Sequence, residues 1–184
     1  MCQFQILSLK IILFDTIPAT SFKTGMITHA PEGYRCPFCA LIAGVQCDGL
    51  HSTPQDIVCR NDRVMAFVAS HWWEKNHGHV LVVPALHYEN LYELPDDVGA
   101  DIFAMSRRIA LALKRGYGCD GVSTRQHNEP AGYQDVWHYH LHVFPRYRND
   151  RLYPADGNKR LSSVKEREPF VAKLRKALAE IGDM

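Results

Sequence analysis

The chain has 184 residues, of which 46% are hydrophobic and 22% charged, and its formal net charge is +1. This length is typical of one domain with a sizeable buried core. The near-zero charge excludes the strong electrostatic footprint of a protein that binds nucleic acid or an anionic membrane surface. A small-molecule ligand is therefore expected.

Residues 1–30 are expected to form an N-terminal extension to a domain that spans 31–184. The apolar run at 4–14 contains Lys10, is too short to cross a membrane, and follows no basic segment of the secretory type. We therefore expect a cytoplasmic protein. Three interpretations of residues 1–25 stay open, namely a disordered tail, an over-long gene start and an added edge strand.

The first expected element is a short helix over residues 38–43. Strands are expected at 57–60 and 64–69, because the Asn-Asp pair between them is typical of a hairpin turn. Residues 79–83 should form the next strand. The pattern so far favours antiparallel pairing.

A long helix is expected from Pro95 to Arg115, where apolar residues recur every three or four positions. Pro95 suits the first turn, and Gly116 is expected to end the helix. Strands at 121–126 and 137–144 follow.

The last expected element is a helix that Ser163 caps and that runs to about Ile181. Pro169 lies late for a first-turn proline, so a kink and a delayed start are alternatives. Strands joined by hairpin-type connections and broken by one long helix predict an α+β fold with a mostly antiparallel five-stranded sheet.

The most informative motif is the alternating run His138-Tyr-His140-Leu-His142. On a strand these imidazoles would share one face, while Trp137 and the intervening residues would pack on the other. A lone strand histidine is usually a hydrogen-bonded core residue, but three in register indicate chemistry, since each buried imidazole needs a polar partner. His140 has an imidazole on both sides and is the candidate nucleophile.

Cys36 and Cys39 form a Cys-x-x-Cys pair whose spacing suits zinc. A proline at the second position also suits redox pairs, and unmetallated thiols are the third interpretation. The other cysteines show no pairing logic and are expected to be free thiols.

The histidine run resembles the signature of the histidine triad (HIT) superfamily of nucleotide hydrolases and transferases. Further motifs occur in family order over residues 36–148: Cys36-Pro-Phe-Cys39-Ala-Leu-Ile-Ala-Gly44, Ala66-Phe67, Gly78-His79-Val-Leu-Val-Val-Pro84 with His87, and Gln134. The resemblance implies a HIT-like α+β fold whose sheet extends across a homodimer.

The resemblance also implies site residues. His140 would attack the α-phosphorus of a nucleotidyl phosphoramidate or a dinucleoside polyphosphate, giving a nucleotidyl-histidine that water hydrolyses. His142 and Gln134 would donate hydrogen bonds to the phosphoryl oxygens. His79 would help to orient the nucleophile through a relay, and Asn128 matches a substrate-binding position. Family members that end the triad in Gln are transferases, so His142 favours hydrolysis.

Some bacterial HIT proteins complete a zinc site with the His after the Val-Pro strand and the first His of the triad. The resemblance therefore implies a zinc site of Cys36, Cys39, His87 and His138. A closed four-ligand site is structural and leaves no position for substrate.

Three features depart from the family pattern. Ala69 replaces a carboxylate that binds the ribose hydroxyls, which predicts loose discrimination between ribose and deoxyribose. Asp135 replaces a Ser or Thr, and its charge would repel a phosphate if it faced the site. The segment 70–77 is longer than the family norm; its two histidines are expected to be solvated in a loop, and its two tryptophans could line the pocket.

Two other functions stay open. One is a zinc-stabilised nucleotide-binding module with little turnover, in which the triad only holds phosphate. The other is a metallohydrolase built on the histidine cluster. Removing metal would stop turnover at once in a metallohydrolase and only destabilise the fold of a HIT-type hydrolase.

Overall fold

The computed structural model describes residues 28–153 and 159–182. The extension expected at 1–30, and with it the three interpretations of residues 1–25, lies outside the described residues except for 28–30. Within the described part, no helix is both long and apolar enough to cross a membrane.

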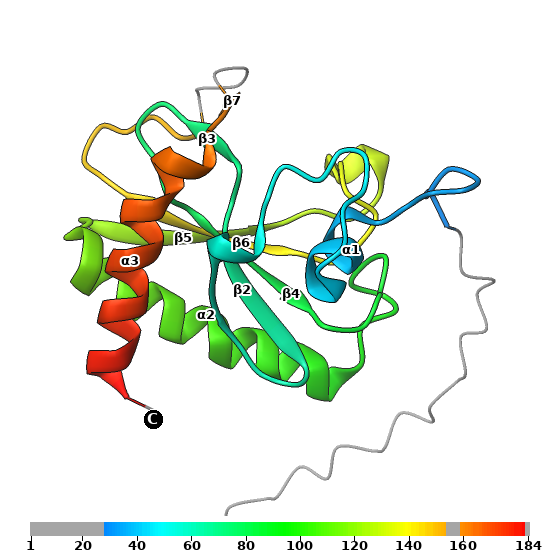
Figure 1. Cartoon of the computed structure of the whole chain (residues 1–184), viewed down its shortest axis with the longest axis horizontal. Coiled ribbons are helices and arrows are strands. Elements are labelled where there is room, and N and C mark those ends of the chain that lie inside the picture. Colours follow the sequence, from blue (N-terminus) through cyan, green and yellow to red (C-terminus); the bar gives the residue numbers. More distant parts are fainter. Residues whose placement is uncertain (1–27, 154–158, 183–184) are drawn as a thin grey trace, which may run out of the picture.

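A five-stranded sheet forms the centre of the fold, and each neighbouring pair of strands is antiparallel, which confirms the expected architecture (Figure 1). Its strands, in spatial order, are β1 (Ile57–Arg60), β2 (Val64–Val68), β4 (Val80–Pro84), β6 (Leu141–Arg146) and β5 (Gly121–Gln126). The Asn-Asp turn joins β1 and β2 as an antiparallel pair, as predicted.

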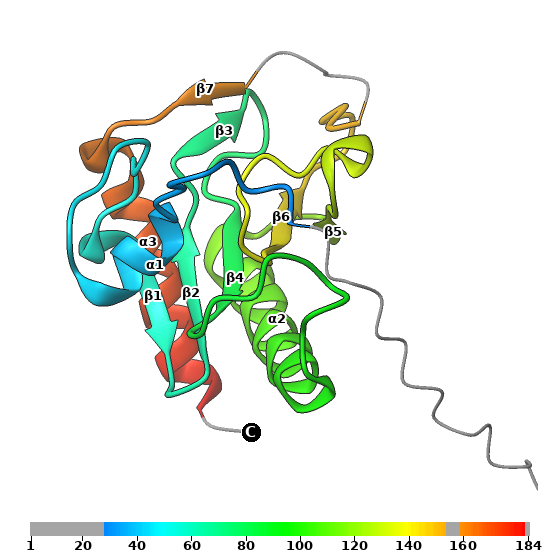
Figure 2. The ribbon, with the colours of Figure 1, turned by 90° about the vertical axis from the view of Figure 1, so that its right-hand side faces the viewer.

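The helices lie on both faces of this sheet. The long helix α2 (Asp96–Tyr117) and the C-terminal helix α3 (Val164–Ile181) cover one face, and the short helix α1 (Pro37–Ala43) lies in front of the other (Figure 2). Two 3-10 turns, η1 (Pro54–Asp56) and η2 (Pro130–Gly132), complete the regular structure of the described residues.

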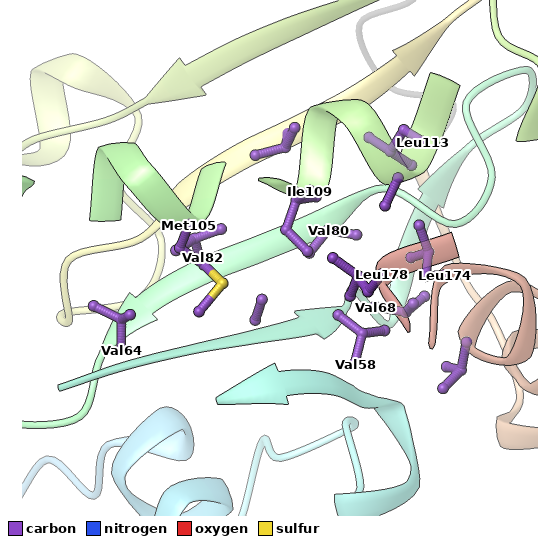
Figure 3. Close-up of a cluster of buried hydrophobic side chains, with 14 of the residues drawn as sticks. Val58, Val64, Val68, Val80, Val82, Met105, Ile109, Leu113, Leu174 and Leu178 are labelled. Atoms are coloured by element: carbon purple, nitrogen blue, oxygen red, sulfur yellow. The ribbon is translucent and has the colours of Figure 1, made fainter. Parts of the chain in front are cut away.

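Burial on both faces explains why all five residues of β2 are buried. Val64 and Val68 belong to the larger core beneath α2 and α3 (Figure 3), whereas Met65 and Phe67 pack with α1 in a smaller one. The alternation follows from the two-residue period of a strand. The candidate site described below lies on the face that carries α1.

Helix α2 passes through Gly116, so the prediction that this glycine ends the helix is wrong. The helix ends one residue after it, at Tyr117, and Gly118 adopts the left-handed conformation with φ of 64°. A Cβ on Gly116 would lie 3.1 Å from the carbonyl oxygen of Lys173 on α3. Gly116 therefore allows the two helices to approach closely.

Helix α3 begins directly after Ser163, without the delayed start that Pro169 left open. The backbone N–H of Glu166 donates to the Ser163 hydroxyl, while the Glu166 carboxylate accepts from the Ser163 backbone at 2.8 Å. This capping box satisfies two N–H groups at the start of the helix. Pro169 lies inside the helix.

Strand β6 begins at Leu141 rather than at Trp137, so its predicted start is wrong. The backbone N–H of Tyr139 donates to the carbonyl of Tyr88 at 2.7 Å, a loop contact that takes the place of strand pairing. Tyr139 still enters the core beneath the helices, but Trp137 stacks on His29 instead.

A second sheet of two antiparallel strands, β3 (His71–Trp73) and β7 (Lys159–Leu161), was not predicted. The expectation of solvated loop histidines is also wrong. His71 is a half-buried residue of β3, and His77 stacks on the buried Trp72 at a ring distance of 5.0 Å.

A buried ion pair joins α3 to the first 3-10 turn. The guanidinium of Arg167 donates to both carboxylate oxygens of Asp56, at 2.7 and 2.9 Å, and both side chains are 1% exposed. Arg167 also donates to the carbonyls of His51 and Ser162. The bidentate geometry and the additional acceptors satisfy a charge that would otherwise be costly to bury.

We predict that Arg167→Met lowers the free energy of unfolding by about 3–5 kcal/mol, because it leaves the Asp56 carboxylate buried without its counter-charge. Urea unfolding followed by circular dichroism measures the change. The control is Arg160→Gln, which breaks an exposed pair with Glu166 and should cost less than about 1 kcal/mol. The double variant Asp56→Leu/Arg167→Met should recover part of the loss. Equal costs for Arg167→Met and Arg160→Gln would contradict the assignment.

Candidate active site and metal centre

The three histidines of the alternating run gather beneath α1. His142 belongs to β6, while His138 and His140 directly precede it. The ring of Phe38 on α1 lies 5.8 Å from that of His138 and 5.4 Å from that of His140, and the rings of His140 and His142 are 5.0 Å apart. The extended backbone before β6 thus maintains the expected alternation of faces.

A backbone carbonyl sets the orientation of His140. Its Nδ1 lies 2.8 Å from the carbonyl oxygen of His138, so Nδ1 carries the proton and donates it. Nε2 keeps its lone pair and lies 3.9 Å from a carboxylate oxygen of Asp135. Burial lowers the pKa of His140 below its usual range, which keeps the ring neutral and nucleophilic near neutral pH.

His79 contacts His142, which in turn contacts His140. A distance of 3.4 Å separates Nε2 of His79 from Nδ1 of His142. His79 is also stacked on Phe144 at 4.5 Å, and burial lowers its pKa to about 3. Its Nδ1 has no hydrogen-bond partner among the described residues. This pattern favours a neutral His79 that donates from Nε2 to His142.

The glycine before His79 is required by its surroundings. Gly78 has φ of 73°, and a Cβ there would lie 2.4 Å from the ring of Phe170 on α3. The hydroxyl of Tyr117, at the end of α2, donates to the Gly78 carbonyl at 3.1 Å and lies 3.3 Å from the carbonyl oxygen of Phe170. Two helices on the far face of the sheet therefore hold the segment that positions His79.

Arg125 lies beside the triad because of the sheet register. It is paired with His142 across β5 and β6, as Leu81 is across β4 and β6, so the three side chains share a face. The guanidinium carbon is 5.1 Å from the ring centres of both Trp73 and Phe144. Sequence reasoning missed Arg125, because its place depends on which residues of β5 and β6 are opposite each other.

Two adjoining cavities open around these residues. The smaller has a volume of about 230 Å³ and contains His140, the apolar side chains of Phe38 and Leu81, and Ala69. The larger, of about 840 Å³, contains Arg125 and extends outward. Both are lined by Trp73, Asp135, His142 and Lys159. The boundary between the cavities is therefore at the end of the triad.

The sequence left open whether Asp135 faces the site. In the structure it does, since Asp135 lines both cavities. Its carboxylate lies 3.2 Å from the ammonium of Lys159 on β7. Burial alone would raise the pKa of Asp135, but several lowering contributions, of which the Lys159 charge is the largest, together outweigh burial, so the pKa lies below its ordinary value. The negative charge that would repel a phosphate is thus present but paired.

Gln134 and Asn128 form hydrogen bonds within the protein. The Gln134 amide group donates to the carbonyls of Glu89 and Val136, at 2.6 and 3.0 Å. Asn128 exchanges hydrogen bonds with Gln126 and accepts one from the backbone of Leu91. Neither side chain forms a hydrogen bond with His140, and their substrate-binding roles stay predictions.

The predicted metal ligands converge. One ligand atom each from Cys36, Cys39, His87 and His138 lies within 4.8 Å of every other. Sulfur-to-Nδ1 distances are 3.3 Å for Cys36–His138, 3.3 Å for Cys39–His87 and 3.5 Å for Cys39–His138. A tetrahedral zinc ion with ordinary bond lengths separates sulfur and nitrogen ligands by about 3.5 Å.

The second ring nitrogen of His138 also suits a metal ligand. Its Nε2 lies 3.1 Å from the carbonyl oxygen of Pro84 and donates to it, which leaves Nδ1 unprotonated toward the two sulfurs. Such an outer hydrogen bond fixes the ring and its tautomer for metal binding. The donor set fits zinc, as does its geometry.

Comparisons with known proteins identify similar chains. Residues 51–149 match the family model described as the HIT domain. The protein Hit of Bacillus subtilis is 35% identical over 119 residues, covering 65% of this chain and 74% of that one. The adenylylsulfatase HINT3 of Arabidopsis thaliana is 28% identical over 148 residues, covering 79% and 71% of the two chains.

Among solved structures, a zinc-bound histidine triad family protein from Mycobacterium smegmatis superposes with a TM-score of 0.64. It is 27% identical, and the match covers 79% of this chain and 94% of that one. This relative therefore shares the fold as well as part of the sequence.

We predict that the ring tautomers of the triad differ at neutral pH. His140 should carry its proton on Nδ1 and His138 on Nε2, because different backbone carbonyls accept from them. Long-range ¹⁵N–¹H NMR of protein labelled in its histidines measures this directly, with His140→Gln identifying the His140 signals. A His140 ring protonated on Nε2 would remove its lone pair from the cavity and contradict the assignment.

Proposed function

Because the chain belongs to the HIT family, we propose that it hydrolyses nucleotides at the α-phosphorus through a covalent intermediate on His140. The observation that supports this most directly is the fixed tautomer of His140, whose lone pair faces a cavity while Nδ1–H is bonded to a backbone carbonyl. Relatives include a protein named as an adenylylsulfatase, which is consistent with a nucleotidyl substrate.

The first step forms a bond between Nε2 of His140 and the α-phosphorus. The bond from phosphorus to the leaving group breaks, and the leaving group departs with the electron pair on the side opposite Nε2. The imidazole becomes cationic, since Nδ1 keeps its proton. The carbonyl of His138, already 2.8 Å from Nδ1, stabilises that charge through the same hydrogen bond.

In the second step water attacks the nucleotidyl-histidine. A new P–O bond forms, the P–N bond breaks, and its electron pair returns to Nε2 while water loses a proton. The nucleotide monophosphate is released and His140 is restored. Dividing one difficult displacement into two is the general advantage of covalent catalysis.

His142 is the proposed donor to the phosphoryl oxygens. If Nε2–H of His79 donates to Nδ1 of His142, the free Nε2 of His142 carries a proton and can donate it. A preorganised donor of this kind is typically worth ~2.7–4 kcal/mol of transition-state stabilisation. His79 thus acts through His142. The relay that the family resemblance implied therefore runs from His79 to His142.

The smaller cavity is the proposed nucleoside site. Phe38, Leu50 and Leu81 provide apolar walls for a base, and Ala69 lies in the same lining. Ser70 and His71, adjacent to Ala69 in the lining, offer polar atoms where the family carboxylate is missing. The homodimer and the cytoplasmic location that we expected from the sequence stay predictions.

We further propose that Cys36, Cys39, His87 and His138 hold one zinc ion. With these four ligands the ion would link α1 to the loop after β4 and to the segment before β6. With all four positions filled by protein atoms, such a site binds no substrate. A zinc-bound structural relative supports the choice of metal.

Replacing His140 with Ala should lower turnover of an adenosine phosphoramidate or a dinucleoside polyphosphate by roughly a thousandfold or more, because the covalent route is lost. Nucleotide release measured by chromatography gives the rate. The control is His77→Ala, since His77 stacks on Trp72 and lies outside both cavities.

Two outcomes would contradict the proposal. Residual activity above about a tenth of wild type in His140→Ala would exclude His140 as the nucleophile. Wild-type protein that binds adenosine monophosphate but turns over neither substrate would favour a binding module.

Protein purified without chelator should contain close to one zinc per chain, and Cys36→Ser should release it and lower the melting temperature, because metal binding contributes to folding. Elemental analysis and thermal unfolding measure the two effects. Cys47→Ser, which alters a half-buried free thiol outside the cluster, is the control. A zinc-free protein with a Cys36–Cys39 disulfide under reducing conditions would exclude the site.

A further inference from the structure

The larger cavity carries a cation that the proposed chemistry has not used. Arg125 lies over the adjoining rings of Trp73 and Phe144, with its guanidinium carbon 5.1 Å from each ring centre. Its buried Nε has no hydrogen-bond partner, and within residues 28–153 and 159–182 it forms no ion pair. A buried donor without an acceptor indicates that a ligand can supply one.

A second cation reaches the same cavity from the C-terminal part of the chain. Lys159 lies on β7, and its ammonium is 3.2 Å from Asp135 and 5.9 Å from the ring of Trp73. Its side chain is 40% exposed. The lining of the larger cavity contains two cations, Arg125 and Lys159, and one carboxylate, that of Asp135. It therefore has an excess of positive charge beside the triad.

The position of this charge relative to His140 is the decisive feature. His140 lines the smaller cavity only, whereas His142 lines both. A phosphorus atom held between His140 and His142 would have its leaving group opposite Nε2, because displacement at phosphorus is in line. The larger cavity, which begins at His142, provides the space on that side.

We propose that Arg125 and Lys159 form a leaving-group subsite that selects an anionic leaving group. The subsite rests on the proposed function, because it takes His140 as the nucleophile. When the P–O bond of a phosphoanhydride breaks, the electron pair and the growing negative charge go to the leaving oxygen, and the two cations stabilise it. In a phosphoramidate the nitrogen takes up a proton from solvent before the P–N bond breaks, so it leaves with the electron pair as a neutral amine and gains no such stabilisation.

Three adenosine substrates with different leaving groups test this. Diadenosine triphosphate releases a nucleoside diphosphate, adenosine 5′-phosphosulfate releases sulfate, and adenosine 5′-phosphoramidate releases ammonia. Arg125→Gln and Lys159→Gln should each lower kcat/KM for the two anhydrides about tenfold or more, and change it for the phosphoramidate less than about threefold. A loss confined to diadenosine triphosphate would assign the subsite to a phosphate chain, and equal losses on both anhydrides would assign it to anionic charge in general.

Two variants serve as controls. Arg125→Lys keeps the charge and should restore a substantial part of the anhydride activity. Arg107→Gln removes an exposed positive charge from α2, on the opposite face of the sheet, and should leave all three rates unchanged. Equal losses on all three substrates for Arg125→Gln, or no loss on any, would overturn the subsite.

A binding measurement separates failure of the subsite from failure of the proposed function. In the His140→Ala background, Arg125→Gln should weaken binding of diadenosine triphosphate about tenfold and that of adenosine monophosphate less than about threefold. Equal weakening of both ligands overturns the subsite whatever the rates are. Full activity of His140→Ala overturns the proposed nucleophile instead.

Discussion

The hydrogen bond from Nδ1 of His140 to the carbonyl of His138 is the interaction on which the proposed chemistry depends. It fixes the tautomer, directs the lone pair into the cavity and is in place to stabilise the cationic intermediate. The same residue, His138, is held at both ring nitrogens, one near the two cysteine sulfurs and the other on the Pro84 carbonyl. His138 therefore links the proposed metal centre to the proposed nucleophile, although no substrate would contact the metal.

Residues of the candidate site come from two sheets, the central five-stranded sheet and the β3–β7 ribbon. The histidines lie in or directly before β4 and β6, which are central strands with neighbours on both sides. The β3–β7 ribbon provides Trp73 and Lys159, which lie at the boundary of the two cavities. The proposed leaving-group subsite therefore combines Arg125, on β5 of the central sheet, with Lys159 of the ribbon. A change in the ribbon could alter substrate preference without moving the triad.

Local sequence patterns predicted the elements that depend on local physics. The hairpin before β4, the long helix and the capped C-terminal helix all follow from periodicity, turn chemistry and caps. The metal ligands, which the family resemblance implied, do lie together. The features that were missed depend on distant parts of the chain: the pairing of β3 with β7, the register that sets Arg125 beside His142, and the Asp56–Arg167 pair. None has a signal within a short window, because each is decided by packing in three dimensions.

The contact of Gly78 with Phe170 and Tyr117 has a consequence for the order of folding. Phe170 lies far from Gly78 in sequence, and forming such a contact requires the closure of a long loop. The β1–β2 hairpin, by contrast, is local and forms without that cost. We expect the β1–β2 hairpin to form before α3 docks, and His79 to be positioned only once α3 has docked. Catalytic competence would then appear later than secondary structure during refolding.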